Sequence, residues 1–216
     1  MSDFSTRRIM MVDTQVRPSD VTKFPIIAAM LSVRRENFVP DARREVAYAG
    51  QNIPLGDRRV VLEARSLAKL LDFLDIQQGE LVMDLGAGLG YASAVMTALG
   101  ARVVAVEDAG MAPAARNRLD AGGCDGVKLV AAPLDQGAPT LGPYDAIIVQ
   151  GAVETMPEAI LAQVKEGGRI GAIFMQGALG TARIGHKQDG AVTWRDAFNA
   201  TAPVLPGFEV LRTFVF

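Results

Sequence analysis

The sequence predicts an α/β fold: a doubly wound, mostly parallel sheet with a helical N-terminal extension and a hairpin-like C-terminal tail. From residue 80 onward, short β-branched runs alternate with helix-compatible segments, which is typical of a parallel sheet with helices on both faces. Residues 81–90, LVMDLGAGLG, join an apolar strand to a glycine-rich turn. Residues 1–75 show helical patterns and no strand pattern. We therefore expect one domain over residues 1–216, with residues 1–75 as the extension and residues 80–216 as the core.

The individual elements follow from local signals. Ser19 and Asp20 can cap a helix that ends near Pro40, and a second helix begins near Glu63. In the tail, Asp189-Gly190 predicts a hairpin turn. Core strands are expected over residues 81–84, 101–107, 127–131, 146–150 and 169–174, with a helix over residues 91–99 and tail strands over residues 191–194 and 210–216.

Composition excludes several classes of function. Half of the 216 residues are apolar, which supports a folded globule. The net charge of −2 and the sequence pI of about 5.5 leave no strong basic field, so nucleic acid is not an expected partner. The first residues lack the apolar stretch of a signal peptide, and no run is long enough to span a bilayer. We expect a cytoplasmic protein that does not bind membranes.

Cysteine and histidine are too rare to build a metal centre. Cys124 is the only cysteine, and without a neighbouring base an inert loop residue is favoured over a reactive thiol. His186 is the only histidine and is expected in a solvated loop before the predicted hairpin turn. No metal site is predicted.

The glycine-rich turn predicts a small-molecule site. Gly86, Gly88 and Gly90 suit a tight turn from strand to helix, where the backbone can approach a ligand because glycine has no Cβ. Asp84 lies just before the turn and would oppose a pyrophosphate, so it favours a cationic ligand. A dinucleotide motif would also require glycine at position 91, where Tyr91 stands. The alternative is a glycine-rich turn with no ligand role.

A second carboxylate lies where a nucleoside sugar would be bound. Glu107 ends the next predicted strand, about 20 residues beyond the glycines, where an acidic side chain can accept hydrogen bonds from both hydroxyls of a ribose. The alternative is a charged residue at the solvated end of a strand. The joint placement of Asp84, the glycines and Glu107 favours the binding hypothesis.

The motif Asp84-x-Gly86-x-Gly88-x-Gly90 resembles the first motif of the Rossmann-like class I methyltransferases, whose ligand S-adenosylmethionine carries an ammonium and a sulfonium. Three further segments resemble the protein-L-isoaspartate O-methyltransferases, and the similarity covers roughly residues 25–210. The segments are residues 34–56 (RRENFVP, then AYAGQNIPLG), residues 144–149 (YDAIIV) and residues 163–169 (QVKEGGR).

The resemblance implies a class I methyltransferase fold and a reaction. The turn and Asp84 would hold the methionine end of S-adenosylmethionine, and Glu107 would hold its ribose. The methyl group would pass to the α-carboxylate of an isoaspartyl residue in a damaged protein or peptide, the first step in its repair. Such a carboxylate is already ionised near neutral pH, so it needs no general base and depends mainly on alignment.

The chain departs from the family pattern where the substrate would bind. Family members usually continue Gln-Thr-Ile-Ser-Gln-Pro after the Pro-Ile-Gly element, and here residues 59–64 read RVVLEA, so Leu62 takes the place of the serine. Leucine cannot hydrogen-bond a carboxylate, and Glu63 would repel one if it faced the same space. Leu62 is alternatively an ordinary core residue that opens the next helix. No catalytic residue can therefore be assigned.

Two more departures concern the cofactor. Ala132-Pro133-Leu134 replaces the family's Gly-Asp-Gly, whose acid reaches the adenine amino group, although Asp135 lies two residues later. Gln150-Gly151-Ala152 replaces Thr-Ala-Ala. The sequence thus leaves two alternatives to isoaspartyl repair: a cofactor-binding homologue that acts as a binding or regulatory module, or a methyltransferase with another acceptor. The oligomeric state is left open.

Overall fold

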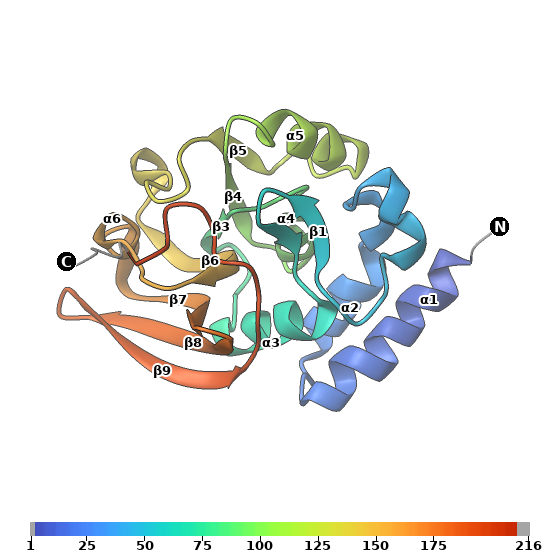
Figure 1. The fold of residues 1–216 in the computed structure, drawn as a ribbon, viewed down its shortest axis with the longest axis horizontal. Helices are drawn as coiled ribbons and strands as arrows, with labels where there is room; N and C mark the ends of the chain where they lie inside the picture. Colours follow the sequence, from blue (N-terminus) through green and yellow to red (C-terminus); the bar gives the residue numbers. More distant parts are fainter. Residues whose placement is uncertain (1–2, 211–216) are drawn as a thin grey trace, which may run out of the picture.

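A computed structural model describes residues 3–210 and contains the predicted doubly wound sheet (Figure 1). The seven strands lie in the order β5-β4-β3-β6-β7-β8-β9. The first five of these pair in parallel, and β8 and β9 extend the sheet antiparallel beyond β7. The strands are β3 (Leu81–Leu85), β4 (Arg102–Glu107), β5 (Lys128–Ala131), β6 (Tyr144–Val153), β7 (Val164–Gln176), β8 (Leu179–Gln188) and β9 (Ala191–Asn199).

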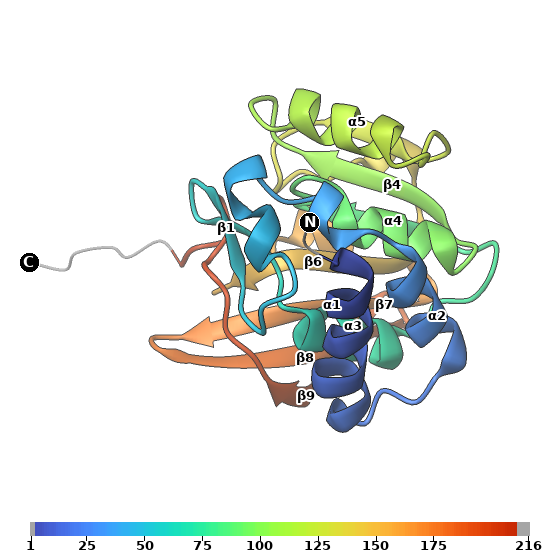
Figure 2. The ribbon, with the colours of Figure 1, turned by 90° about the vertical axis from the view of Figure 1, so that its right-hand side faces the viewer.

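Helices and irregular segments cover the two faces of the sheet (Figure 2). One face packs against the N-terminal extension and the helices α3, α4 and α5, whose buried side chains form one apolar cluster. The other face packs against the η5 turn (Pro139–Leu141), α6 and the segment 203–208. The helices are α1 (Phe4–Met11), α2 (Phe24–Ser32), α3 (Ala64–Leu74), α4 (Tyr91–Ala98), α5 (Ala112–Ala121) and α6 (Glu158–Leu161).

The N-terminal extension is not purely helical, which corrects the sequence prediction. A two-stranded antiparallel hairpin, β1 (Ile53–Gly56) with β2 (Arg59–Val61), lies outside the main sheet. Its two turn residues, Asp57 and Arg58, have φ of 46° and 59°. Both central residues of a two-residue type I′ turn require positive φ, which explains these values. The turn contains no glycine at these two positions, so the usual sequence signal of such a hairpin is missing.

Two other parts of the sequence prediction differ from the structure. Ser19 and Asp20 do not cap a helix: they end a short 3₁₀ turn (Arg17–Ser19), and α2 begins later, with Pro25 in its first turn. Proline suits that position because its missing N–H would have no helical partner there. In the tail, β8 was not predicted, and it pairs with β9 through the predicted Asp189-Gly190 turn. The predicted strand 210–216 lies almost wholly outside the described residues.

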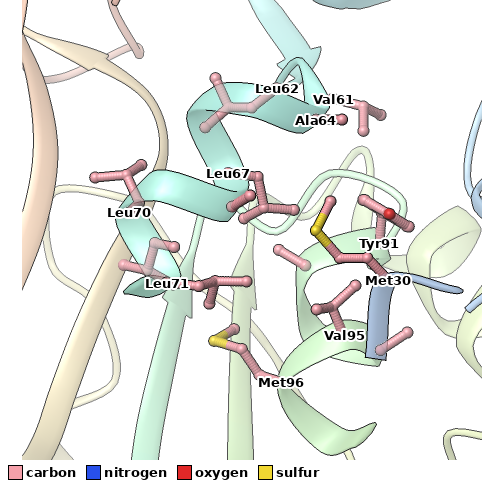
Figure 3. Close-up of a cluster of buried hydrophobic side chains, with 14 of the residues drawn as sticks. Met30, Val61, Leu62, Ala64, Leu67, Leu70, Leu71, Tyr91, Val95 and Met96 are labelled. Atoms are coloured by element: carbon pink, nitrogen blue, oxygen red, sulfur yellow. The ribbon is translucent and has the colours of Figure 1, made fainter. Parts of the chain in front are cut away.

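Leu62 is a core residue, as the structural alternative proposed. The residue is 1% exposed and lies two positions before the start of α3, near the buried Val61 and Ala64 (Figure 3). Helix α3 presents Leu67, Leu70 and Leu71 to the same core. Position 62 therefore contributes apolar packing. Within residues 3–210, no helix has the length and apolarity that a membrane crossing would require.

Candidate cofactor site

The three glycines form the predicted turn between β3 and α4. Gly86, Gly88 and Gly90 have φ of 75°, 60° and 94°, a region that disfavours residues with a Cβ. The turn lies at the carboxyl ends of β3 and β4, and β6 pairs on the other side of β3, so the chain reverses its strand order here. Ligands of doubly wound sheets bind at such a switch point. The turn therefore has the position and backbone conformation that the sequence predicts.

Asp84 is fully buried, and its carboxylate is engaged by the protein. Ser93 Oγ donates a hydrogen bond to Oδ2 at 2.5 Å, and Gln150 Nε2 donates one to Oδ1 at 2.9 Å. Burial raises the pKa of Asp84 to about 6, and the two hydrogen bonds oppose the rise. In this arrangement Asp84 braces β3 against α4 and β6. Its assignment to the methionine ammonium remains a prediction.

Glu107 is also buried, at the end of β4, and carries four hydrogen bonds. Arg59 Nη1 and Nη2 donate to its two oxygens at 2.5 Å each, which makes a bidentate ion pair. The backbone N–H groups of Gly88 and Asp108 donate at 2.6 and 2.8 Å. Burial raises the pKa of Glu107, and the charge and hydrogen bonds of Arg59 oppose that rise. The carboxylate predicted to hold a ribose is thus held by an arginine.

Apolar side chains close over the same turn. A Cβ built on Gly88 would lie 2.7 Å from Leu55 Cδ1, and a Cβ on Gly86 would lie 3.2 Å from Arg59 Nη2 and 3.3 Å from Leu205 Cδ1. Leu205 also lies over Gly151, where a Cβ would be 2.5 Å from its Cδ2. Side chains of the chain itself therefore lie against these glycines. In this arrangement Arg59 occupies the position on Glu107 that a ribose would take.

Two segments distant in sequence supply this cover. Arg59 and Leu55 belong to the β1–β2 hairpin, and Leu205 belongs to a segment that pairs with the end of β6 through Ala152. Arg58 and Glu209 join the two segments by an exposed ion pair of 2.6 Å. A pocket of about 420 Å³ opens beside the cover; its lining includes Leu55, Leu89, Asp108 and Met111.

The other residues that the sequence singled out form no contact with Asp84 or Glu107 among the interactions described above. Pro133 is exposed, and Asp135 lies against Gly207 in the C-terminal segment. Cys124 is buried and burial raises the pKa of its thiol, which fits the inert assignment. His186 is exposed on β8 rather than in a loop, paired across the sheet with Arg169 and Thr193.

Sequence reasoning missed the partners of both carboxylates. Arg59, Ser93 and Gln150 were not singled out as site residues, although Arg59 and Gln150 each had a local signal. Arg59 replaces a family glutamine in RVVLEA, and Gln150 ends the strand predicted over residues 146–150. In the parallel register Asp84 pairs with Ile148 of β6. Side chains two residues apart in a strand point to the same face, so Gln150 lies on the same face of β6 as Ile148 and one step nearer the carboxyl ends of the strands.

Comparisons with known proteins agree with the fold and the motifs. A family model described as Protein-L-isoaspartate(D-aspartate) O-methyltransferase matches residues 9–199. The protein-L-isoaspartate O-methyltransferase of Methylorubrum extorquens is 37% identical over 169 residues, covering 78% of this chain and 74% of the relative. The enzyme of the same name from Methanoculleus marisnigri is 33% identical over 161 residues, covering 74% of this chain and 73% of the relative.

Two solved structures share the fold. A protein-L-isoaspartate O-methyltransferase superimposes with a TM-score of 0.78 at 22% identity, covering 94% of this chain and 66% of that chain. A candidate protein-L-isoaspartate O-methyltransferase of Plasmodium falciparum, in complex with S-adenosyl-L-homocysteine, superimposes with a TM-score of 0.79 at 16% identity, covering 95% and 99%. The family match over most of the chain, with the glycine turn in place, shows that this chain belongs to the protein-L-isoaspartate(D-aspartate) O-methyltransferase family.

Proposed function

We propose that the protein is an S-adenosylmethionine-dependent carboxyl O-methyltransferase that acts on isoaspartyl residues of proteins or peptides. The observation that carries this proposal is the family match over residues 9–199. The turn of Gly86, Gly88 and Gly90 at the switch point of the sheet supports it, because that is where the fold binds its ligand. We retain Glu107 as the proposed ribose ligand and Asp84 as the proposed residue near the methionine end.

Methyl transfer to an isoaspartyl peptide tests the proposal directly. The protein would be incubated with methyl-labelled S-adenosylmethionine and a peptide that contains one isoaspartyl residue. We expect base-labile methyl ester on this peptide and none on the same peptide with a normal aspartyl residue, because only the first presents the α-carboxylate as a free group. Absence of ester, in an assay where an active family member forms it, contradicts the proposal.

A second candidate is a binding or regulatory module that has lost the transfer step. Two observations favour it: the buried Leu62 stands where the family has its serine, and Arg59 holds Glu107. Such a protein would bind S-adenosylhomocysteine and form no ester on any isoaspartyl peptide. Calorimetric binding combined with the ester assay therefore separates the two candidates.

A further inference from the structure

We propose that Arg59 is an internal ligand of the ribose subsite, which keeps the cofactor site closed until the adenosyl group displaces it from Glu107. The β1–β2 hairpin is then an autoinhibitory lid. This inference rests on the proposed use of S-adenosylmethionine. It assigns a role to a residue that stands where the family usually has glutamine.

The first argument is the saturation of the Glu107 carboxylate. Its two oxygens accept four hydrogen bonds: two from Arg59, one from the N–H of Gly88 and one from the N–H of Asp108. A carboxylate has about four acceptor positions, so none is left for a ribose hydroxyl. The two backbone donors belong to the glycine turn and to the residue that follows β4, and they stay in place. Arg59 is the group that a ribose must replace.

The second argument is the chemistry of the exchange. A guanidinium that binds a buried carboxylate through two charge-assisted hydrogen bonds is held more strongly than a neutral diol. The cofactor must therefore supply other contacts to win the exchange, and its apparent affinity is reduced by the fraction of molecules in which the site is open. A glutamine at position 59 would carry no charge and could not form this ion pair.

The third argument is that Arg59 already has a second carboxylate partner, which it can keep when it leaves Glu107. Asp108 Oδ2 lies 3.1 Å from Arg59 Nη1, and the Asp108 side chain is 48% exposed at the edge of the 420 Å³ pocket. Moving outward, the guanidinium would keep one carboxylate while it releases Glu107. Arg59 Nε is buried with no hydrogen-bond partner among the described residues, so the closed position does not satisfy every donor.

The fourth argument is that the hairpin closes the site as a unit. Leu55, on the strand opposite Arg59, covers Gly88, while Arg59 itself covers Gly86. The turn residues of the hairpin, Asp57 and Arg58, both have backbone angles in the left-handed region, which costs free energy for residues other than glycine. The lid is thus a small element, outside the main sheet and with a strained turn. An opening motion of the hairpin would uncover Gly88 and Glu107 together and remove Arg59 from Gly86.

Calorimetric titration with S-adenosylhomocysteine tests the inference on the full-length protein. Arg59→Gln removes the charge and restores the family's residue type, so we expect a dissociation constant roughly tenfold lower or better, as for a closed form that holds about 90% or more of the molecules. Arg59→Lys keeps the buried positive charge and loses the bidentate geometry. It is expected to stay folded and to bind with intermediate affinity.

Arg169→Gln is the matched control. Arg169 Nη1 and Nη2 form a comparable bidentate pair with Glu80, at 2.7 Å each, but Glu80 precedes β3 at the opposite edge of the sheet. This variant should bind with unchanged affinity. Adding Glu107→Gln to Arg59→Gln should remove the gain, because the ribose then loses its carboxylate.

The outcomes separate the inference from the proposed function. Equal affinity of the wild-type, Arg59→Lys and Arg59→Gln proteins overturns the inference and leaves the cofactor assignment standing. Weaker binding by Arg59→Gln also overturns it, since Arg59 would then contribute to the open site. If none of the folded proteins binds at millimolar ligand, the cofactor assignment fails, and the inference fails with it.

Discussion

At the residue scale, Asp84 joins three elements through a carboxyl group that has no contact with solvent. Ser93 from α4 and Gln150 from β6 both donate to it. Both hydrogen bonds favour the ionised form, yet burial has the larger effect and raises the pKa to about 6. The folded protein therefore holds a proton on Asp84 in mildly acidic solution, at a pH where the unfolded chain, with a pKa of 3.8, has released it.

This difference predicts how Asp84 affects stability with pH. The pKa of Asp84 is higher in the folded protein than in the unfolded chain. Its favourable contribution to the free energy of unfolding is therefore complete below pH 3.8 and is lost as the pH rises to about 6. Asp84→Asn cannot titrate, so its stability relative to wild type should increase between pH 4 and pH 7, by at most about 3 kcal/mol. Urea unfolding of both proteins across this range measures the change. Parallel pH profiles would refute it.

The sequence allowed the candidate site residues to be predicted, but it did not reveal their interaction partners. Asp84, the glycines and Glu107 stand at the ends of strands, and strand ends can be read from the pattern of apolar residues. Arg59 reaches Glu107 across 48 positions of sequence, and Gln150 reaches Asp84 across 66. Such pairs depend on how the hairpin and β6 approach β3, and no local pattern encodes that approach.

At the element scale, the β1–β2 hairpin is the feature that sequence patterns did not indicate. Its strands have four and three residues, too few for a visible alternation of apolar and polar side chains. Its turn, Asp57-Arg58, lacks the Asn-Gly or Asp-Gly signal of a type I′ turn. The Asp189-Gly190 turn carries that signal and was predicted correctly. The difference lies in the residue after the aspartate.

The same comparison predicts a stabilising change. Replacing Asp57-Arg58 by Asn-Gly should relieve the left-handed Arg58 by about 1 to 2 kcal/mol, and lose the exposed Arg58–Glu209 pair, worth about 0 to 1 kcal/mol. We expect a net gain of about 1 kcal/mol in the free energy of unfolding. Asp189→Asn, in a turn that already contains glycine, is the control and should change little. No gain in thermal or urea unfolding would contradict the prediction.

At the scale of the whole molecule, Arg35 ties the N-terminal extension to the core. Its fully buried guanidinium donates to the carbonyls of Ala47 and Leu62, at 2.7 Å each, and lies 4.6 Å from the centre of the Tyr91 ring. Burial lowers the pKa of Arg35. One side chain thus holds two segments of the extension together and contacts the core at Tyr91, the first residue of α4. We therefore expect residues 1–75 and the core to unfold together.

Coincident transitions would support the single-domain prediction. Trp194 on β9 packs edge to face on Phe174 at 4.8 Å between ring centres, so its fluorescence reports the far end of the sheet, and far-UV circular dichroism reports the helices. Arg35→Ala leaves two carbonyls without their donor and should lower both transitions equally, by about 3 kcal/mol. A separate early transition of the helical signal would show that the extension is an independent unit.

Arg58 and Arg59 are neighbours in the chain, yet salt acts on them differently. The Arg58–Glu209 pair is exposed, 53% and 37%, whereas the Arg59 and Glu107 side chains are 2% and 0% exposed. At 1 M ionic strength charges are screened within about 3 Å in water, and buried pairs are screened far less. Concentrated salt therefore loosens the link between the hairpin and the C-terminal segment while the guanidinium stays on Glu107. The two halves of the cover can in this way be released one at a time.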